Sequence, residues 1–121
     1  MERQPTLETE RLVIRPLVEE DREALYRIAS DPAVWEQHPI HDRWQREVFD
    51  AFFDDGFASG GSLAVVRKSD KAVIGHTRYD RFDPEEGGVV EIGWTFLAPI
   101  CWGKGINTEM KRAMLEHAFS S

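Results

Sequence analysis

A short glycine-containing turn between a strand pattern and a helix pattern constrains the fold of this chain more than any other feature. Residues 89–97 read VVEIGWTFL, a β-branched and aromatic run that favours a strand, and Pro99 closes it. The residues that follow recur at the spacing of one helix face: Ile106, Met110, Ala113, Met114 and His117. Trp102-Gly103-Lys104-Gly105 lies between the two patterns. The chain therefore passes from a strand into a helix within a few residues.

Such a turn can bind an anion. The first N–H groups of a helix have no partner within the helix, and the helix dipole adds positive charge there. Glycine at positions 103 and 105 leaves room for a phosphate to approach the backbone. A tight turn without a ligand fits the same residues, and two glycines before a helix do not by themselves separate the two interpretations.

The turn is part of a longer motif. It comprises Glu91-Ile92-Gly93-Trp94, Leu97, Pro99, Trp102-Gly103-Lys104-Gly105 and Thr108-Glu109. This motif resembles the acetyl-coenzyme A loop of the GNAT superfamily of N-acetyltransferases, most closely its RimJ/RimL-type branch. The opening LETERLVIRPL, residues 7–17, also resembles the start of RimJ/RimL-type chains. Two positions depart from the pattern: Ile100 stands where Gln or Arg is common, and Asn107 where a small residue is usual.

The resemblance implies a function and a co-substrate. It implies transfer of an acetyl group from acetyl-coenzyme A to a primary amine, by direct attack within a ternary complex. The pyrophosphate would lie on the N–H groups of the turn, and the pantetheine arm would pair with the strand before it. The residues that would bind the coenzyme are Phe96, Leu97, Trp102, Gly103, Lys104, Gly105, Ile106, Asn107 and Thr108.

Glu91 is the first candidate for the catalytic base. An amine arrives as ammonium, and a carboxylate can accept its proton directly or through water. Strict alternation along the strand would put Glu91 on one face with Gly93 and Thr95, opposite Val90, Ile92, Trp94 and Phe96. A carboxylate at the rim of the sheet, paired with Arg78 or Arg81, remains an equal alternative.

Four further residues are candidates for the acceptor side. The resemblance implies that the loop near Trp35 and His38 shapes the acceptor pocket, and His76 and Tyr79 lie on the strand expected beside Glu91. Metal binding by Glu36, His38 and His41 is not expected, because Pro39 breaks any helix that would align the imidazoles. Cys101 is not expected to act as a nucleophile, because no histidine partner adjoins it.

The remaining patterns predict one α/β domain over residues 1–121. The elements follow the order β-α-α-β-β-β-α, as strand 12–14, helix 18–30, a helix from Asp42 to Gly56 with a capping box at Gln45, strands 62–67, 72–82 and 89–97, and helix 107–119. By the resemblance this is a GNAT-like, mostly antiparallel sheet flanked by helices, and the later β-α-β-β of the family is absent. Whether the chain is truncated or natively short stays open.

The composition limits the classes of partner and the cellular location that are expected for this chain. The net charge of −7 argues against nucleic acid and suits a cationic amine. A single cysteine permits no internal disulfide, and no signal peptide or membrane-spanning run is visible, so a cytoplasmic protein is expected. The identity of the amine cannot be read from the sequence.

Two further expectations complete the sequence-based interpretation. A catalytically inert coenzyme-binding fragment of such a domain is the alternative to an active enzyme. A nucleotide-binding domain is less supported, because no G-x-x-x-x-G-K-[ST] run occurs.

If strand 89–97 has no later neighbour, its outer edge and helix 107–119 are expected to promote self-association.

Overall fold

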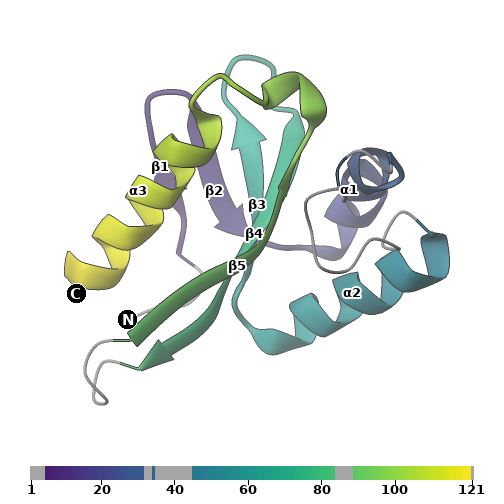
Figure 1. Cartoon of the computed structure of the whole chain (residues 1–121), viewed down its shortest axis with the longest axis horizontal. Coiled ribbons are helices and arrows are strands. Elements are labelled where there is room, and N and C mark those ends of the chain that lie inside the picture. Colours follow the sequence, from purple (N-terminus) through teal and green to yellow (C-terminus); the bar gives the residue numbers. More distant parts are fainter. Residues whose placement is uncertain (1–4, 32–33, 35–44, 84–88, 121) are drawn as a thin grey trace.

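The computed structural model of the chain describes residues 5–31, 34, 45–83 and 89–120. Within these residues one antiparallel sheet follows the chain order: β1 Leu7–Glu8, β2 Leu12–Pro16, β3 Ser62–Arg67, β4 Val73–Asp83 and β5 Val89–Leu97. Helices α1 (Arg22–Ala29) and α2 (Arg46–Ser59) cover one face, and α3 (Ile106–Ser120) covers the other (Figure 1). The predicted α/β fold, a mostly antiparallel sheet flanked by helices, is confirmed.

Most predicted boundaries agree with the structure to within one or two residues. β3 and β5 have the predicted ends, β4 is displaced by one residue, and α3 extends one residue further at each end. A 3-10 turn, Glu19–Asp21, precedes α1, so the predicted first helix divides in two. β1 was not predicted. It contains only two residues, too few to produce a pattern, and it forms because Leu7 pairs with Ile14 of β2.

The predicted end of α2 at Gly56 is wrong. The helix continues to Ser59 and ends at Gly60, whose φ of +73° is the left-handed conformation that commonly terminates helices. Gly56 is buried, and a Cβ there would lie 2.7 Å from Oγ of Ser62. The glycine therefore permits α2 to pack closely on β3. The predicted capping residue Asp42 lies outside the described residues, and α2 begins at Arg46.

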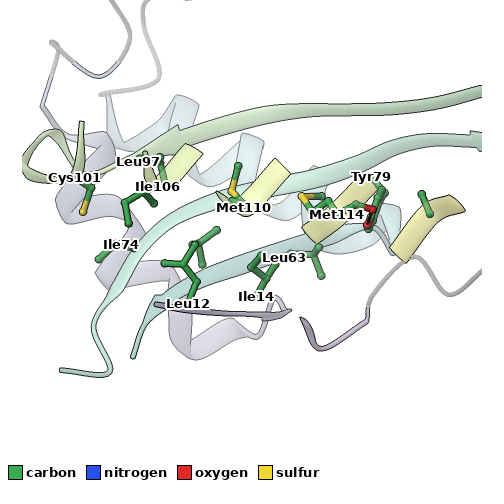
Figure 2. Packing of buried hydrophobic residues seen from close by; sticks show 12 residues of the cluster. Leu12, Ile14, Leu63, Ile74, Tyr79, Leu97, Cys101, Ile106, Met110 and Met114 are labelled. Carbon is green, nitrogen blue, oxygen red and sulfur yellow. Dashed lines mark hydrogen bonds between the residues drawn. The ribbon is translucent and has the colours of Figure 1, made fainter. Parts of the chain in front are cut away.

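Two hydrophobic clusters pack on the two faces of the sheet. The α3-facing cluster is aliphatic and sulfur-rich, as Figure 2 shows, and contains Leu12, Ile14, Leu63, Val65, Ile74, Tyr79, Leu97, Cys101, Ile106, Met110, Met114 and Ala118. The opposite cluster is more aromatic and contains Leu17, Leu25, Ala29, Val34, Phe49, Phe52, Phe53, Ala64 and Phe96. Met110 and Met114 are fully buried, which confirms the predicted apolar face of α3.

A bulge in β5 overturns the predicted alternation of side chains. Gly75 pairs with Leu97 and Arg78 pairs with Gly93, so two residues of β5, Trp94 and Thr95, oppose Thr77 alone. The extra residue reverses the phase of the strand. Ile92 packs against the α3-facing cluster and Phe96 packs in the opposite one. The prediction that these two side chains share a face is therefore wrong.

β5 forms an edge of the sheet in the described part of the chain. Its backbone pairs with β4 on one side, and no described strand lies on the other. An edge of this kind presents N–H and C=O groups that another strand can bind. Self-association through this edge and α3 stays a prediction. Among the described residues, none of the helices has both the length and the hydrophobicity needed to cross a bilayer.

Candidate functional site

The turn between β5 and α3 presents an open row of backbone donors. A 3-10 turn, Pro99–Cys101, follows β5, and the first helical hydrogen bond of α3 runs from N–H of Glu109 to the carbonyl of Gly105 at 3.0 Å. Within the described residues, no N–H group of positions 103–108 makes a well-formed hydrogen bond to an acceptor of the chain. The start of α3 therefore has unpaired N–H groups and the positive end of the helix dipole at one surface.

Gly103 and Gly105 are required by the backbone of this turn. Both have φ of +75°, a conformation that side chains disfavour. A Cβ on Gly103 would meet no atom within 4 Å, so its requirement is conformational and the space beside it is open. The neighbouring Trp102 and Ile100 are 48% and 68% exposed. The donors therefore face a surface that a large anion can reach.

Trp102 ties the turn back to the end of β5. Its indole Nε1–H donates to the carbonyl oxygen of Leu97 at 3.0 Å. The sequence placed both residues among the coenzyme ligands, but it did not show this bond between them. The carbonyl of Leu97 already accepts one hydrogen bond, and the side chains of Phe96 and Leu97 are buried. Pairing of the pantetheine arm with this part of β5 stays a prediction.

A polar network fastens the turn to the first hairpin of the sheet. Glu109 Oε1 accepts a hydrogen bond from Nε of Arg11 at 2.8 Å, and Oε2 accepts from the backbone N–H of Arg11 at 3.1 Å and from the hydroxyl of Thr9. A guanidinium NH1 of Arg11 donates to the carbonyl of Lys104 at 2.9 Å. The sequence analysis noted Thr9-Glu10-Arg11 and Thr108-Glu109 in separate motifs and missed that they meet.

The network stabilises the charged form of Glu109. Burial alone would raise the pKa of its carboxyl, but hydrogen bonds from Thr9 and Arg11 outweigh burial and hold the pKa below its ordinary value. The carboxylate is therefore charged at neutral pH, and Arg11 supplies the compensating positive charge.

The structure places two predicted acceptor-side residues in the packed interior. His76 is 2% exposed and stacks on Phe96 with ring centroids 5.6 Å apart. Tyr79 is fully buried, and its hydroxyl donates to the carbonyl of Met114. Burial raises the pKa of the Tyr79 phenol, which therefore stays protonated. The two side chains lie on opposite faces of the sheet, and their predicted contact with an acceptor stays untested.

Three predicted site residues lie partly or wholly outside the described residues. Trp35 and His38 fall in the range 35–44, and for Glu91 only the backbone is described, opposite Arg81 of β4. Arg78, one of the two suggested partners of Glu91, donates from NH1 to Asp55 at 3.2 Å. The role of Glu91 stays a prediction. In the part of the chain that is described, no cluster of metal-ligating side chains occurs.

A shallow groove of about 410 Å³ runs along the outer face of α3 from the same turn. Its lining residues are Asn107, Thr108, Lys111, Arg112, Leu115 and Glu116. Lys111 and Arg112 bring two positive charges within about two helical turns of the open N–H groups. The surface around the start of α3 therefore favours an anionic ligand.

Comparison with known families identifies the family to which the segment containing this turn belongs. The Acetyltransferase (GNAT) domain family matches residues 11–121. The chain belongs to this family. The GNAT match includes the turn, α3 and the Arg11 network, apart from Thr9. It supports acyl transfer as the class of reaction.

Relatives of known sequence or structure agree with the GNAT assignment. The uncharacterized N-acetyltransferase p20 of Bacillus licheniformis is 31% identical over 121 residues, which cover 96% of this chain and 67% of that protein. The acetyltransferase (GNAT family) from Bacillus anthracis superposes with a TM-score of 0.80 at 24% identity, over 96% of this chain and 67% of that one.

A further solved structure of similar fold contains bound ligands. The microcin C7 self-immunity acetyltransferase MccE, in complex with acetyl-CoA and AMP, has a TM-score of 0.69 at 14% identity, over 93% of this chain and 64% of that one. At this identity the likeness concerns the fold alone. The chain thus spans about two thirds of the length of these three proteins.

Proposed function

We propose that this chain is an N-acetyltransferase that moves an acetyl group from acetyl-CoA to a primary amine. The observation that carries the proposal is the row of unpaired N–H groups at the start of α3, within the segment that matches the GNAT family. Within that family we favour the RimJ/RimL type, because Glu91-Ile92-Gly93-Trp94 and Trp102-Gly103-Lys104-Gly105 resemble its motif.

The proposed coenzyme site fits the donors that the chain offers. The N–H groups from Gly103 to Asn107, with the hydroxyl of Thr108, would hold the pyrophosphate, since a helix N-terminus favours negative charge. Lys104 and Trp102 are exposed beside them. The pantetheine arm would lie along the edge of β5 that no described strand pairs, near Phe96 and Leu97. A protein of the same fold, MccE, is described in complex with acetyl-CoA.

The proposed reaction is direct attack by the neutral amine on the thioester carbonyl. Glu91 would accept the proton of the incoming ammonium, directly or through water. The nitrogen then forms a bond to the carbonyl carbon and loses a second proton to water, the carbon–sulfur bond breaks, and the thiolate takes up a proton. Among the described residues, no donor is assigned for this last proton. Holding both reactants in one complex supplies much of the rate by proximity.

The acceptor is proposed to be cationic before it reacts. The net charge of −7 favours an amine over an anionic acceptor. Trp35 and His38 would lie on the acceptor side, whereas His76 and Tyr79 are buried and would support the site from within the sheet. These features fit a cytoplasmic enzyme that acts on protein N-termini or small amines.

Calorimetry with acetyl-CoA, followed by an acetylation assay, tests the proposal. The chain is expected to bind acetyl-CoA at one site and, when given a panel of amines, to produce an acetylated product detectable by mass spectrometry. Binding without any product across the panel would favour the inert coenzyme-binding alternative. No heat of binding at millimolar ligand would overturn the proposed coenzyme site.

A further inference from the structure

Two segments at opposite ends of the chain meet beside the open start of α3. Thr9 and Arg11 come from the turn between β1 and β2. Both contact the side chain of Glu109, and Arg11 also contacts the backbone of Lys104. Arg11 and Glu109 are 98 residues apart in the sequence. The hairpin turn itself is held in place: the Leu12 N–H donates to the Thr9 hydroxyl at 3.0 Å, and the Lys68 N–H donates to the carbonyl of Arg11 at 2.8 Å.

We propose that Arg11 is a positioning residue that orients the anion-binding turn and keeps the Glu109 carboxylate out of it. The inference rests on the proposed function, because it concerns the same coenzyme site. It assigns to the first hairpin a role in coenzyme affinity, although no residue of that hairpin is expected to touch the reacting groups.

The first part of the argument concerns the peptide unit between Lys104 and Gly105. Arg11 NH1 binds the carbonyl oxygen of Lys104 at 2.9 Å. In a trans peptide the C=O and the following N–H point in opposite directions, and no cis peptide occurs among the described residues. Fixing the carbonyl towards Arg11 therefore points the N–H of Gly105 away from Arg11.

The second part concerns the charge of Glu109. An acid in the first turn of a helix is attracted to the N–H groups there, and a free carboxylate would compete with an anionic ligand. Both carboxylate oxygens of Glu109 are bound instead by Thr9 and Arg11. Arg11 also offsets the negative charge at 2.8 Å, which reduces the repulsion that a pyrophosphate would meet.

Stability alone is a weak reason for this network. The side chain of Arg11 is 44% exposed, and exposed ion pairs contribute little to the free energy of unfolding. Arg46 provides a matched comparison, because it is 39% exposed and binds Glu23 and Asp50 between α1 and α2, on the opposite face of the sheet. The two arginines differ chiefly in the groups that they bind: Arg11 binds the turn before α3, and Arg46 binds acids of α1 and α2.

The test compares Arg11→Ala with Arg46→Ala by calorimetry. We expect Arg11→Ala to weaken binding of coenzyme A about tenfold, and Arg46→Ala to change it less than twofold. Arg11→Lys should recover only part of the loss, because an ammonium lacks the guanidinium fork that reaches two acceptors. Acetyl-pantetheine, which has no pyrophosphate, should bind the wild type and Arg11→Ala equally. Equal losses for the two ligands, or for the two alanine variants, would overturn the inference.

A ligand-free measurement separates this inference from the proposed function. In amide NMR spectra, Arg11→Ala should shift the Gly103 and Gly105 signals and leave that of Gly60 unchanged, whereas Arg46→Ala should leave all three unchanged. If the wild type fails to bind coenzyme A, the proposed function is overturned while these shifts still test the orientation of the turn. Unmoved Gly103 and Gly105 signals in Arg11→Ala would overturn the positioning role itself.

Discussion

The acids at the starts of α1 and α3 bind partners at very different distances along the chain. Asp21, in the 3-10 turn before α1, is 3% exposed, and its carboxylate accepts the N–H of Val18 at 2.9 Å. The same carboxylate receives both NH groups of Arg15, at 2.9 and 2.8 Å. Asp21 thus binds groups that lie within six residues of it, and its side chain makes no cap hydrogen bond to α1 itself.

The start of α3 also carries an acid, but the acid is directed elsewhere. Glu109 binds Thr9 and Arg11 of a distant hairpin, and the N–H groups of the turn before it remain unpaired within the described residues. The comparison shows that an acid at a helix start can be bound by its sequence neighbours or by a distant segment. A helix start whose acid is paired with an arginine, and whose N–H groups that acid does not bind, can receive an anionic ligand.

The largest expected effect comes from closing the open start with side chains. Gly103→Val and Gly105→Val should each abolish binding of acetyl-CoA in calorimetry, because φ of +75° strains any side chain and a valine would obstruct the approach of a phosphate. Unchanged affinity in both variants would contradict the proposed site.

Gly60→Val is the matched control for these substitutions. Gly60 has nearly the same backbone conformation, φ of +73°, and open space around its Cβ, but it lies at the C-terminal end of α2. The control should lose stability, as the other two variants do, while retaining wild-type affinity for acetyl-CoA. Equal loss of affinity in Gly60→Val would mean that strain, and not the site, causes the effect.

The next largest effect is expected at Glu91 and separates chemistry from binding. In a form of the enzyme that turns over, Glu91→Gln should lower turnover roughly a hundredfold, the usual scale for loss of a general base. Affinity for acetyl-CoA should not change, because the open start of α3 is untouched. Wild-type turnover at saturating amine across the pH range would instead support a carboxylate paired at the rim of the sheet.

Removing the acid at the start of α1 should lower the stability of the fold and leave coenzyme binding unchanged. Asp21→Ala removes a buried acceptor of the Val18 N–H and leaves Arg15, whose side chain is 32% exposed, without its partner. We expect a loss of about 2 kcal/mol in the free energy of unfolding, less than for a fully buried pair. Urea denaturation measures the loss, and calorimetry should find acetyl-CoA affinity unchanged. A large fall in affinity would show that the two helix starts are coupled.

The smallest effect concerns the pH dependence of the Glu109 network. Because hydrogen bonds lower the folded-state pKa of this carboxyl, its contribution to stability is complete above the unfolded value of about 4.3. The contribution is lost as pH falls through the lowered folded-state pKa. Wild type should therefore exceed Glu109→Gln in stability by about 1 kcal/mol or less at neutral pH, and the difference should vanish in acid. A constant difference down to low pH would contradict the assignment.

The sequence predicted the elements whose patterns are long and locally consistent. β5 is a continuous run of β-branched and aromatic residues, and α3 repeats the period of a helix several times, so their positions agree with the structure to within one residue. The two-residue β1 was missed, because it exists only through pairing with β2. Gly56 was misinterpreted as a helix end because sequence cannot distinguish a glycine needed for close packing from one needed for φ.

The candidate site likewise has features that the sequence predicted and features that it did not. The glycine turn was visible because two glycines before a helix have a local cause, the backbone conformation at +75°. The bulge at Trp94–Thr95 was not visible, because it depends on the register with β4, and it changed which face each β5 side chain takes. The bond from Trp102 to Leu97 was likewise decided by how the turn folds back.

The sequence by itself determined the family, the strand–turn–helix unit and the backbone donors at its centre, because each follows from residues close together in the chain. Only the tertiary structure decided where the Glu109 carboxylate binds. Thr9 and Arg11 bind it from the other end of the chain, and the sheet brings these segments together. Contacts over such a separation leave no periodic signal, since they are set by the packing of whole elements and not by local conformational preference.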